Sequence, residues 1–181
     1  MNLPNKLTLL RVCMIPFFVA FARMNTFWAQ CVAVGIYALA CITDTLDGRI
    51  ARSRNLITDF GKFMDPIADK LLVMSAMIVL TAQHRMPDWV CILMLAREFM
   101  VSGFRLVAVE NGTVIAAGML GKIKTVLQML ATIALMLFVP VQGEVGPLGV
   151  FAKVLMYAAM VMTVWSGADY IIRNRECIRD M

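Results

Sequence analysis

Apolar stretches long enough to cross a lipid bilayer make up almost the whole of this 181-residue chain. A membrane-spanning helix needs about 20 mostly apolar residues. Stretches of roughly that length predict six helices, near residues 6–22, 26–52, 58–83, 88–110, 118–140 and 147–172. Short turns that contain proline, glycine or asparagine separate them. We therefore expect an all-α integral membrane protein with six transmembrane helices, forming a single domain over residues 1–181.

The composition of the chain agrees with this prediction. Hydrophobic residues make up 61% of the sequence and charged residues 16%, whereas soluble domains are about half apolar and a quarter charged. The first apolar stretch carries Arg11, and no small-residue cleavage site follows it, so we expect a retained helix and not a removed signal peptide. Six helices leave no room for a separate soluble domain.

Basic residues are unevenly distributed between the two ends of the predicted helices. If the N-terminus is cytoplasmic, the outer side keeps only Arg23 and Arg85 in its turns, with Lys153 in the outer half of the last helix. The inner side then receives Lys6, Arg11, Arg49, Arg52, Arg54, Lys62, Lys70, Arg105, Lys122, Lys124, Arg173, Arg175 and Arg179. Cytoplasmic loops of membrane proteins carry such an excess. We therefore expect a polar cavity that faces the cytosol. Because no organellar transit segment precedes the first helix, we expect the membrane to be a bacterial-type inner membrane.

Acidic residues are predicted at the cytosolic ends of the second and third helices, within the membrane. Beyond Asp69 only residues 71–82 are continuously apolar, and about a dozen residues are too few to span alone. The third helix must therefore begin earlier and include Asp65 and Asp69. The second helix runs directly into Asp44 and Asp47. Ionisable residues in such positions usually face a polar cavity and mark a functional site.

These aspartates occur in the pattern Asp44-x2-Asp47-Gly48-x2-Ala51-Arg52-x8-Gly61-x3-Asp65-x3-Asp69. Spacings of three and four residues fall on one face of a helix, and the glycine one turn from each pair leaves space for a ligand. Four carboxylates in one poorly hydrated volume repel one another strongly. Two Mg²⁺ or Mn²⁺ ions would offset that charge, and oxygen ligands suit both metals. The pattern favours a two-metal site over four separate solvated carboxylates.

The pattern resembles the signature of the CDP-alcohol phosphotransferases, which is Asp-x2-Asp-Gly-x2-Ala-Arg, then eight or nine residues, then Gly-x3-Asp-x3-Asp. Every position of the signature is filled in this chain. Three further segments resemble the branch of the family that uses glycerol 3-phosphate: Pro4-Asn5-x2-Thr8-x2-Arg11, Ala96-Arg97-Glu98-Phe99-x-Val101-Ser102-Gly103 and Gly121-Lys122-x-Lys124-Thr125.

The resemblance implies a role for each position of the signature. Asp44, Asp47 and Asp65 would be metal ligands, and Asp69 would both bind metal and accept the proton of the attacking hydroxyl. The implied residues that hold the CDP-linked lipid are Asn5, Thr8, Gly48, Arg52, Thr58 and Gly61. The implied reaction transfers the phosphatidyl group of CDP-diacylglycerol to sn-glycerol 3-phosphate within the membrane, and relatives of this kind are homodimers.

The acceptor carries a phosphate dianion, so it needs cationic side chains. Our candidates are Arg97 and Arg105 in the fourth helix and Lys122 and Lys124 at the cytosolic start of the fifth, with Arg97 and Lys122 the leading pair. Arginine offers phosphate a planar fork of donors, and lysine offers a point charge. Two alternatives stay open at this stage. The two lysines could be cytosolic-side anchors, and Arg97 could pair structurally with Glu98 or an aspartate.

Other functions explain less of the pattern. Inositol phosphate, phosphatidylglycerol or serine as the acceptor would leave the metal site unchanged. A small cation transporter needs ionisable residues with a route to both faces, whereas the outer halves of the predicted helices offer almost none. A purely structural role in a membrane complex would not explain why Gly48 and Gly61 lie at helical spacing from the aspartates, on the same helix faces.

Overall fold

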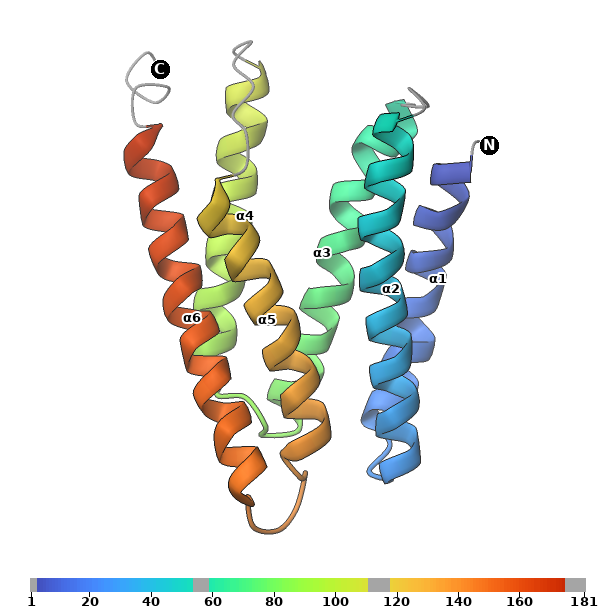
Figure 1. Cartoon of the computed structure of the whole chain (residues 1–181), viewed down its shortest axis with the longest axis vertical. Coiled ribbons are helices and arrows are strands. Elements are labelled where there is room, and N and C mark those ends of the chain that lie inside the picture. The colour runs from blue at the N-terminus through green and yellow to red at the C-terminus, as the bar shows by residue number, and fades with distance from the viewer. Residues whose placement is uncertain (1–2, 54–58, 111–117, 175–181) are drawn as a thin grey trace. The chain divides into compact units, whose positions relative to one another are not determined.

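A computed structural model describes residues 3–53, 59–110 and 118–174 (Figure 1). Within these residues it contains no strand, and its helices are α1 (Leu3–Arg23), α2 (Phe27–Ser53), α3 (Asp59–Ala82), α4 (Asp88–Glu110), α5 (Met119–Phe138) and α6 (Pro147–Arg173). Each helix lies within three residues of its predicted limits. The all-helical prediction is therefore confirmed for the described part of the chain.

Local chemistry explains where several helices begin. α6 has Pro147 at its first position, where the missing backbone N–H is not needed and the fixed φ angle suits the helix. α4 begins directly after Pro87, and the Asp88 carboxylate accepts a hydrogen bond of 2.9 Å from the Trp89 backbone N–H. α3 begins at Asp59 and so includes Asp65 and Asp69, as the length of the apolar run predicted.

The chain divides into two compact units, which we call unit 1 (Met1–Gln83) and unit 2 (His84–Met181). In unit 1, α1 packs along both α2 and α3, which contact each other much less. Phe18 of α1 and Tyr37 of α2 are buried there, with ring centroids 5.8 Å apart. The single domain over residues 1–181 stays a prediction.

In unit 2, α6 packs against α5 and α4. Two aromatic pairs join α4 to α6: the rings of Trp89 and Tyr157 have centroids 6.1 Å apart, and those of Phe104 and Tyr170 are 5.8 Å apart. Arg85, in the turn before α4, donates a hydrogen bond of 3.4 Å to the carbonyl of Met136 in α5. The three helices of this unit are thus linked by apolar packing and by polar contacts.

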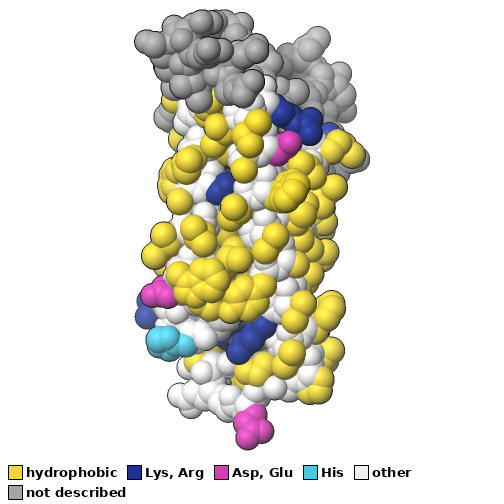
Figure 2. All heavy atoms as spheres, turned by 90° about the vertical axis from the view of Figure 1, so that its left-hand side faces the viewer, with side chains coloured by type: hydrophobic (Ala, Val, Ile, Leu, Met, Phe, Trp, Pro, Cys, Tyr) yellow, Lys and Arg dark blue, Asp and Glu magenta, His cyan; other side chains and the backbone are white. Residues whose placement is uncertain are grey.

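Large hydrophobic side chains cover the outside of the helices. The following are more than half exposed: Phe17, Trp28, Met119, Phe151, Trp165 and Ile172. In Figure 2, hydrophobic side chains (yellow) are spread over the middle of the face that is turned toward the viewer. Soluble proteins rarely expose apolar surface of this extent, which suits lipid instead.

Two of the described helices, α5 and α6, are long and apolar enough to cross a membrane. Phe27–Thr43 and Lys70–Ala82 are shorter apolar stretches of helix. The structure thus supports a helical membrane protein with two candidate spans. Six spans around a cytosol-facing cavity remain a prediction.

Candidate active site

The aspartate pattern lies at one end of unit 1. Asp44 and Asp47 belong to the C-terminal part of α2, and Asp65 and Asp69 belong to the N-terminal half of α3. The chain reverses between these helices, and Figure 1 shows the end of α2 and the start of α3 at the same end of the unit as the start of α1. The backbone therefore brings all four positions to one end of a three-helix unit.

Most of the predicted ligands have side chains outside the described residues. They are the metal ligands Asp44, Asp47, Asp65 and Asp69 and the lipid-binding positions Asn5, Gly48, Arg52, Thr58 and Gly61. Among the side chains that the structure does describe, no three His, Cys, Asp or Glu residues are grouped to hold a metal ion. The roles of the four aspartates stay predictions.

Thr8 is a predicted lipid-binding residue whose side chain is described. It lies in α1 and is only 1% exposed. Arg11, one helical turn further on, is also 1% exposed. A guanidinium buried in an apolar bundle needs polar or charged partners, so Arg11 joins the candidate site. From the sequence, Arg11 was a basic residue of the inner side and the last position of the family-like segment that begins at Pro4, but no binding role was assigned to it. Its three-residue spacing from Thr8 places both on one helix face.

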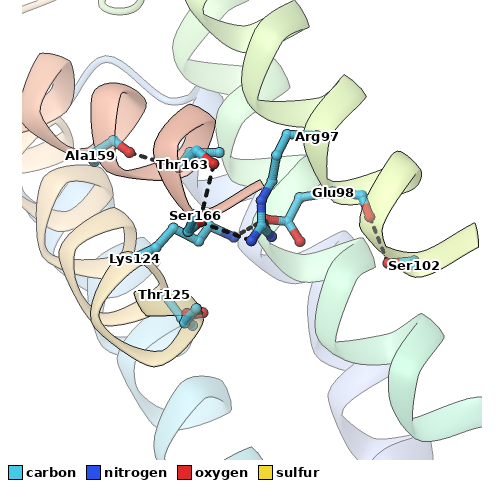
Figure 3. Close-up of polar contacts among 9 residues, drawn as sticks. Arg97, Glu98, Ser102, Lys124, Thr125, Ala159, Thr163 and Ser166 are labelled. Carbon is cyan, nitrogen blue, oxygen red and sulfur yellow. Dashed lines mark hydrogen bonds and ion pairs between the residues drawn. The ribbon is translucent and has the colours of Figure 1, made fainter. Parts of the chain in front are cut away.

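A second polar cluster connects the three helices of unit 2 (Figure 3). Arg97 and Glu98 come from α4, Lys124 from α5 and Ser166 from α6. The Glu98 carboxylate pairs with the Lys124 ammonium group, and its Oε1 lies 3.5 Å from Arg97 Nη1. Arg97 Nη2 donates a hydrogen bond of 2.9 Å to Ser166 Oγ. We call these four residues the α4–α6 cluster.

The α4–α6 cluster is well shielded from solvent. The side chains of Arg97, Glu98 and Lys124 are 13%, 16% and 5% exposed. Because two cations share one carboxylate, the three side chains carry one net positive charge. A net positive charge at this place would attract an anionic group. Arg97 Nε has no hydrogen-bond partner among the described residues, which leaves donor capacity for phosphate oxygens.

The structure brings together two of the four predicted acceptor-site residues. Arg97 and Lys124 both contact Glu98, whereas Arg105 and Lys122 are exposed and lie outside the cluster. The preference for Lys122 over Lys124 therefore finds no support, and the burial of Lys124 disfavours a surface-anchor role for it. The alternative contact between Arg97 and Glu98 is confirmed.

Ser166 was not identified from the sequence. A single serine in a long apolar helix shows no spacing or charge pattern that would mark it. The signal that points to it is the buried Arg97, because a buried guanidinium requires acceptors from neighbouring helices.

Comparisons with known proteins match the chain over nearly its full length. A family model described as CDP-alcohol phosphatidyltransferase matches residues 1–165. The CDP-diacylglycerol–glycerol-3-phosphate 3-phosphatidyltransferase of Bacillus subtilis (strain 168) is 41% identical, covering 98% of this chain and 97% of that protein. The probable phosphatidylglycerophosphate synthase of Mycobacterium tuberculosis (strain ATCC 25618 / H37Rv) is 45% identical, covering 95% of this chain and 81% of that protein. A protein of Salmonella paratyphi A with the same name as the Bacillus relative is 38% identical over 99% of this chain.

Proposed function

This chain belongs to the CDP-alcohol phosphatidyltransferase family, and on that premise we propose that it transfers the phosphatidyl group of CDP-diacylglycerol to sn-glycerol 3-phosphate. The products are phosphatidylglycerophosphate and CMP. The observation that carries this proposal is the identity of 41% over almost the entire length of both chains with a relative named for that reaction. The proposal assigns the chain to the synthesis of anionic phospholipids.

Enzymes of this family generally depend on divalent metal ions, and the donor set of unit 1 fits such ions. The predicted ligands are Asp44, Asp47, Asp65 and Asp69, and carboxylate oxygens are the ligands that Mg²⁺ and Mn²⁺ prefer. Two bound ions would neutralise charge on the diphosphate and on the transition state. The position of all four residues at one end of unit 1 supports this assignment.

The proposed reaction is a displacement at phosphorus. The free primary hydroxyl of glycerol 3-phosphate attacks the phosphorus atom that carries the diacylglycerol. A new O–P bond forms while the bond to the CMP oxygen breaks, and CMP leaves with that electron pair. Asp69 accepts the proton of the attacking hydroxyl. Catalysis of this kind depends mainly on positioning and on electrostatic stabilisation.

For the donor lipid we propose binding by Asn5, Thr8, Gly48, Arg52, Thr58 and Gly61, the positions that match the family pattern. Thr8 is buried in α1, which packs along α2 and α3, and these two helices carry Gly48, Arg52 and Gly61. This burial supports its inclusion. Arg11 extends this set because a second buried polar side chain lies one turn from Thr8.

For the acceptor we propose that Arg97 and Lys124 hold the phosphate group of glycerol 3-phosphate. Their shielded, net positive cluster supports this role. The fork of Arg97 suits a phosphate with two oxygens side by side, and Lys124 adds a second positive charge. Arg105 and Lys122 are exposed, and we assign them to the cytosolic surface at the entrance for this anionic substrate, where they raise its local concentration.

We further propose that the protein spans a bacterial-type inner membrane six times, with the active site facing the cytoplasm, and that it forms a homodimer. The excess of basic residues on one side of the predicted spans supports the orientation. The apolar outer surface of the helices supports the membrane setting.

The proposed function is tested with purified protein in detergent. The protein is supplied with CDP-diacylglycerol, Mg²⁺ and one acceptor at a time from a panel of glycerol 3-phosphate, inositol phosphate, serine and phosphatidylglycerol, and CMP release is measured. We expect release with glycerol 3-phosphate alone, and no release after the metal is removed with a chelator. Release with another acceptor only would reassign the substrate, and release with none from folded protein would refute the proposal.

The proposed base is tested with Asp69→Asn in the same assay. We expect CMP release to fall about a thousandfold, because general base catalysis contributes on that order and a metal ligand is weakened as well. Asp169→Asn is the matched control, since Asp169 pairs with Arg173 on the surface of α6 at 2.7 Å. Full activity in the Asp69 variant would exclude the assigned role.

A further inference from the structure

Two adjacent small residues of α6 lie against the side chain of Arg97. Ser166 and Gly167 are both buried. Ser166 contacts the guanidinium group of the Arg97 side chain, which extends from α4 (Figure 3), and Gly167 lies against the same side chain. We propose that Ser166 and Gly167 are positioning residues that hold Arg97 in the orientation needed to bind the acceptor phosphate. This inference rests on the proposed function, and it assigns a role to a helix that lies outside the aspartate signature.

Gly167 provides space that any other residue would fill. A Cβ atom built at this position would lie 2.8 Å from Arg97 Cγ and 3.3 Å from Arg97 Nε. Carbon atoms do not approach that closely, because favourable separations are about 3.5–4.0 Å. The arginine arm can therefore lie along α6 only because Gly167 has no side chain. Small residues allow close contacts of this kind between membrane helices.

Ser166 fixes the far end of the same arm. Its hydroxyl donates a hydrogen bond of 3.1 Å to the Thr163 carbonyl within α6. Because a hydroxyl has one hydrogen, this bond leaves the Oγ lone pairs to accept from Arg97 Nη2 at 2.9 Å. A hydrogen bond that involves a charged group is roughly twice as strong as a neutral one. Gly167 thus sets the path of the arm, and Ser166 sets the rotation of its guanidinium group.

The test compares the two substrates in the full-length protein. Gly167→Ala displaces the arginine arm, and we expect the KM for glycerol 3-phosphate to rise about tenfold while the KM for CDP-diacylglycerol changes less than about twofold. Ser166→Ala removes one charged hydrogen bond, and we expect a selective rise of about fivefold. Equal changes for both substrates, or no change for either, would overturn the inference.

Gly149→Ala is the matched control for crowding in α6. A Cβ atom there would lie 2.7 Å from the Phe138 carbonyl oxygen and would also meet Val145, but neither residue belongs to the α4–α6 cluster. We expect Gly149→Ala to lower the thermal unfolding midpoint while the folded protein keeps both KM values. A selective rise in the KM for glycerol 3-phosphate in this variant would contradict the inference. It would show that crowding anywhere along α6 weakens acceptor binding, whether or not the position of Arg97 changes.

A double-mutant cycle shows whether Gly167 acts through Arg97. In the Arg97→Ala variant, residue 97 has no Cγ atom for a side chain at position 167 to meet. Adding Gly167→Ala to that variant should therefore cause no further change in the thermal unfolding midpoint or in the KM for glycerol 3-phosphate. Additive effects would overturn the inference. The unfolding cycle does not need activity. If the wild-type protein released no CMP, the proposed function would fail. Non-additive unfolding midpoints in the cycle would still show that Gly167 positions the side chain of Arg97.

Discussion

Glu98 contacts two cations, the largely shielded Arg97 and the buried Lys124, and its carboxylate offsets part of their charge. Removing one member of a buried ionic group is costly because the others keep their charge without a partner. The net positive charge of these three side chains supports the proposed binding of a phosphate group, which such a charge attracts. If the proposal holds, stability and acceptor binding are coupled at the scale of single residues, at Glu98.

This coupling predicts the behaviour of Glu98→Gln. We expect the variant to lose about 3 kcal/mol of stability, the typical cost of breaking a buried ion pair. A ligand that binds the folded state stabilises that state. Without the Glu98 charge, Arg97 and Lys124 should attract the phosphate more strongly, so glycerol 3-phosphate should raise the thermal unfolding midpoint of the variant by more than it raises that of the wild type. The measurement is thermal unfolding in detergent with and without glycerol 3-phosphate.

The matched control for Glu98→Gln is Asp169→Asn, which removes a partly exposed carboxylate from its ion pair with the exposed Arg173 of the same helix. Such pairs contribute only about 0.3–0.5 kcal/mol, so neither the midpoint nor its response to glycerol 3-phosphate should change much. An equal response to the ligand in Glu98→Gln and in the wild type would show that the α4–α6 cluster does not bind the acceptor.

At the scale of helices, the end of α1 depends on two glutamine side chains. The Ala22 carbonyl accepts hydrogen bonds from the side-chain amides of Gln30 at 2.8 Å and Gln83 at 2.7 Å, and the Gln30 amide also donates to Met24 at 2.8 Å. Carbonyls in the last turn of a helix have no partner within the helix. The two glutamines therefore tie the end of α1 to α2 and to the end of α3.

Replacing both glutamines should cost more stability than the sum of the two single replacements. In Gln30→Leu or Gln83→Leu the Ala22 carbonyl keeps one partner, whereas in the double variant it keeps neither of these two donors. A buried acceptor left unsatisfied costs about 1–3 kcal/mol. The measurement is a double-mutant cycle on the free energy of unfolding. Additive effects would show that the carbonyl finds another donor.

The limits of all six helices followed from the sequence because apolar length and turn chemistry are local properties. Pro147 and Asp88 begin α6 and α4 as their residue types predict. The inclusion of Asp65 and Asp69 in α3 also followed, since the apolar run after them is too short to span a membrane. Which helices pack together was not predictable in the same way. That α1 packs along both α2 and α3 depends on side-chain fit.

At the scale of the whole molecule, the reaction that the sequence predicted is the one for which the relatives of this chain are named, whereas the residues of the acceptor site stay a prediction. Arg97 was predicted because it interrupts a long apolar stretch. Lys122 was preferred to Lys124, but the structure exposes Lys122 and buries Lys124. Two residues apart on a helix they point to different sides, and packing alone decides which side is buried. Ser166 and Gly167 gave no signal of their own, because their role exists only where the arm of Arg97 crosses from α4 to α6.

The orientation of the whole chain gives a prediction that does not depend on the chemistry. If basic residues mark the cytoplasmic side, the turns before α2 and before α6 face outward and the end of α6 faces inward. Asn25, Glu144 and Arg173 are exposed at these three places. We would replace each with cysteine, one at a time, in a chain whose five natural cysteines are changed to serine.

A membrane-impermeant maleimide should then label the cysteines at positions 25 and 144 in intact cells, because both turns are in contact with the outside. The cysteine at position 173 should react only after the membrane is permeabilised. Labelling of position 173 in intact cells would place the C-terminal end of α6 outside. That result would contradict the cytoplasmic site, because the active-site end of six antiparallel spans would then face away from the cytosolic pool of glycerol 3-phosphate.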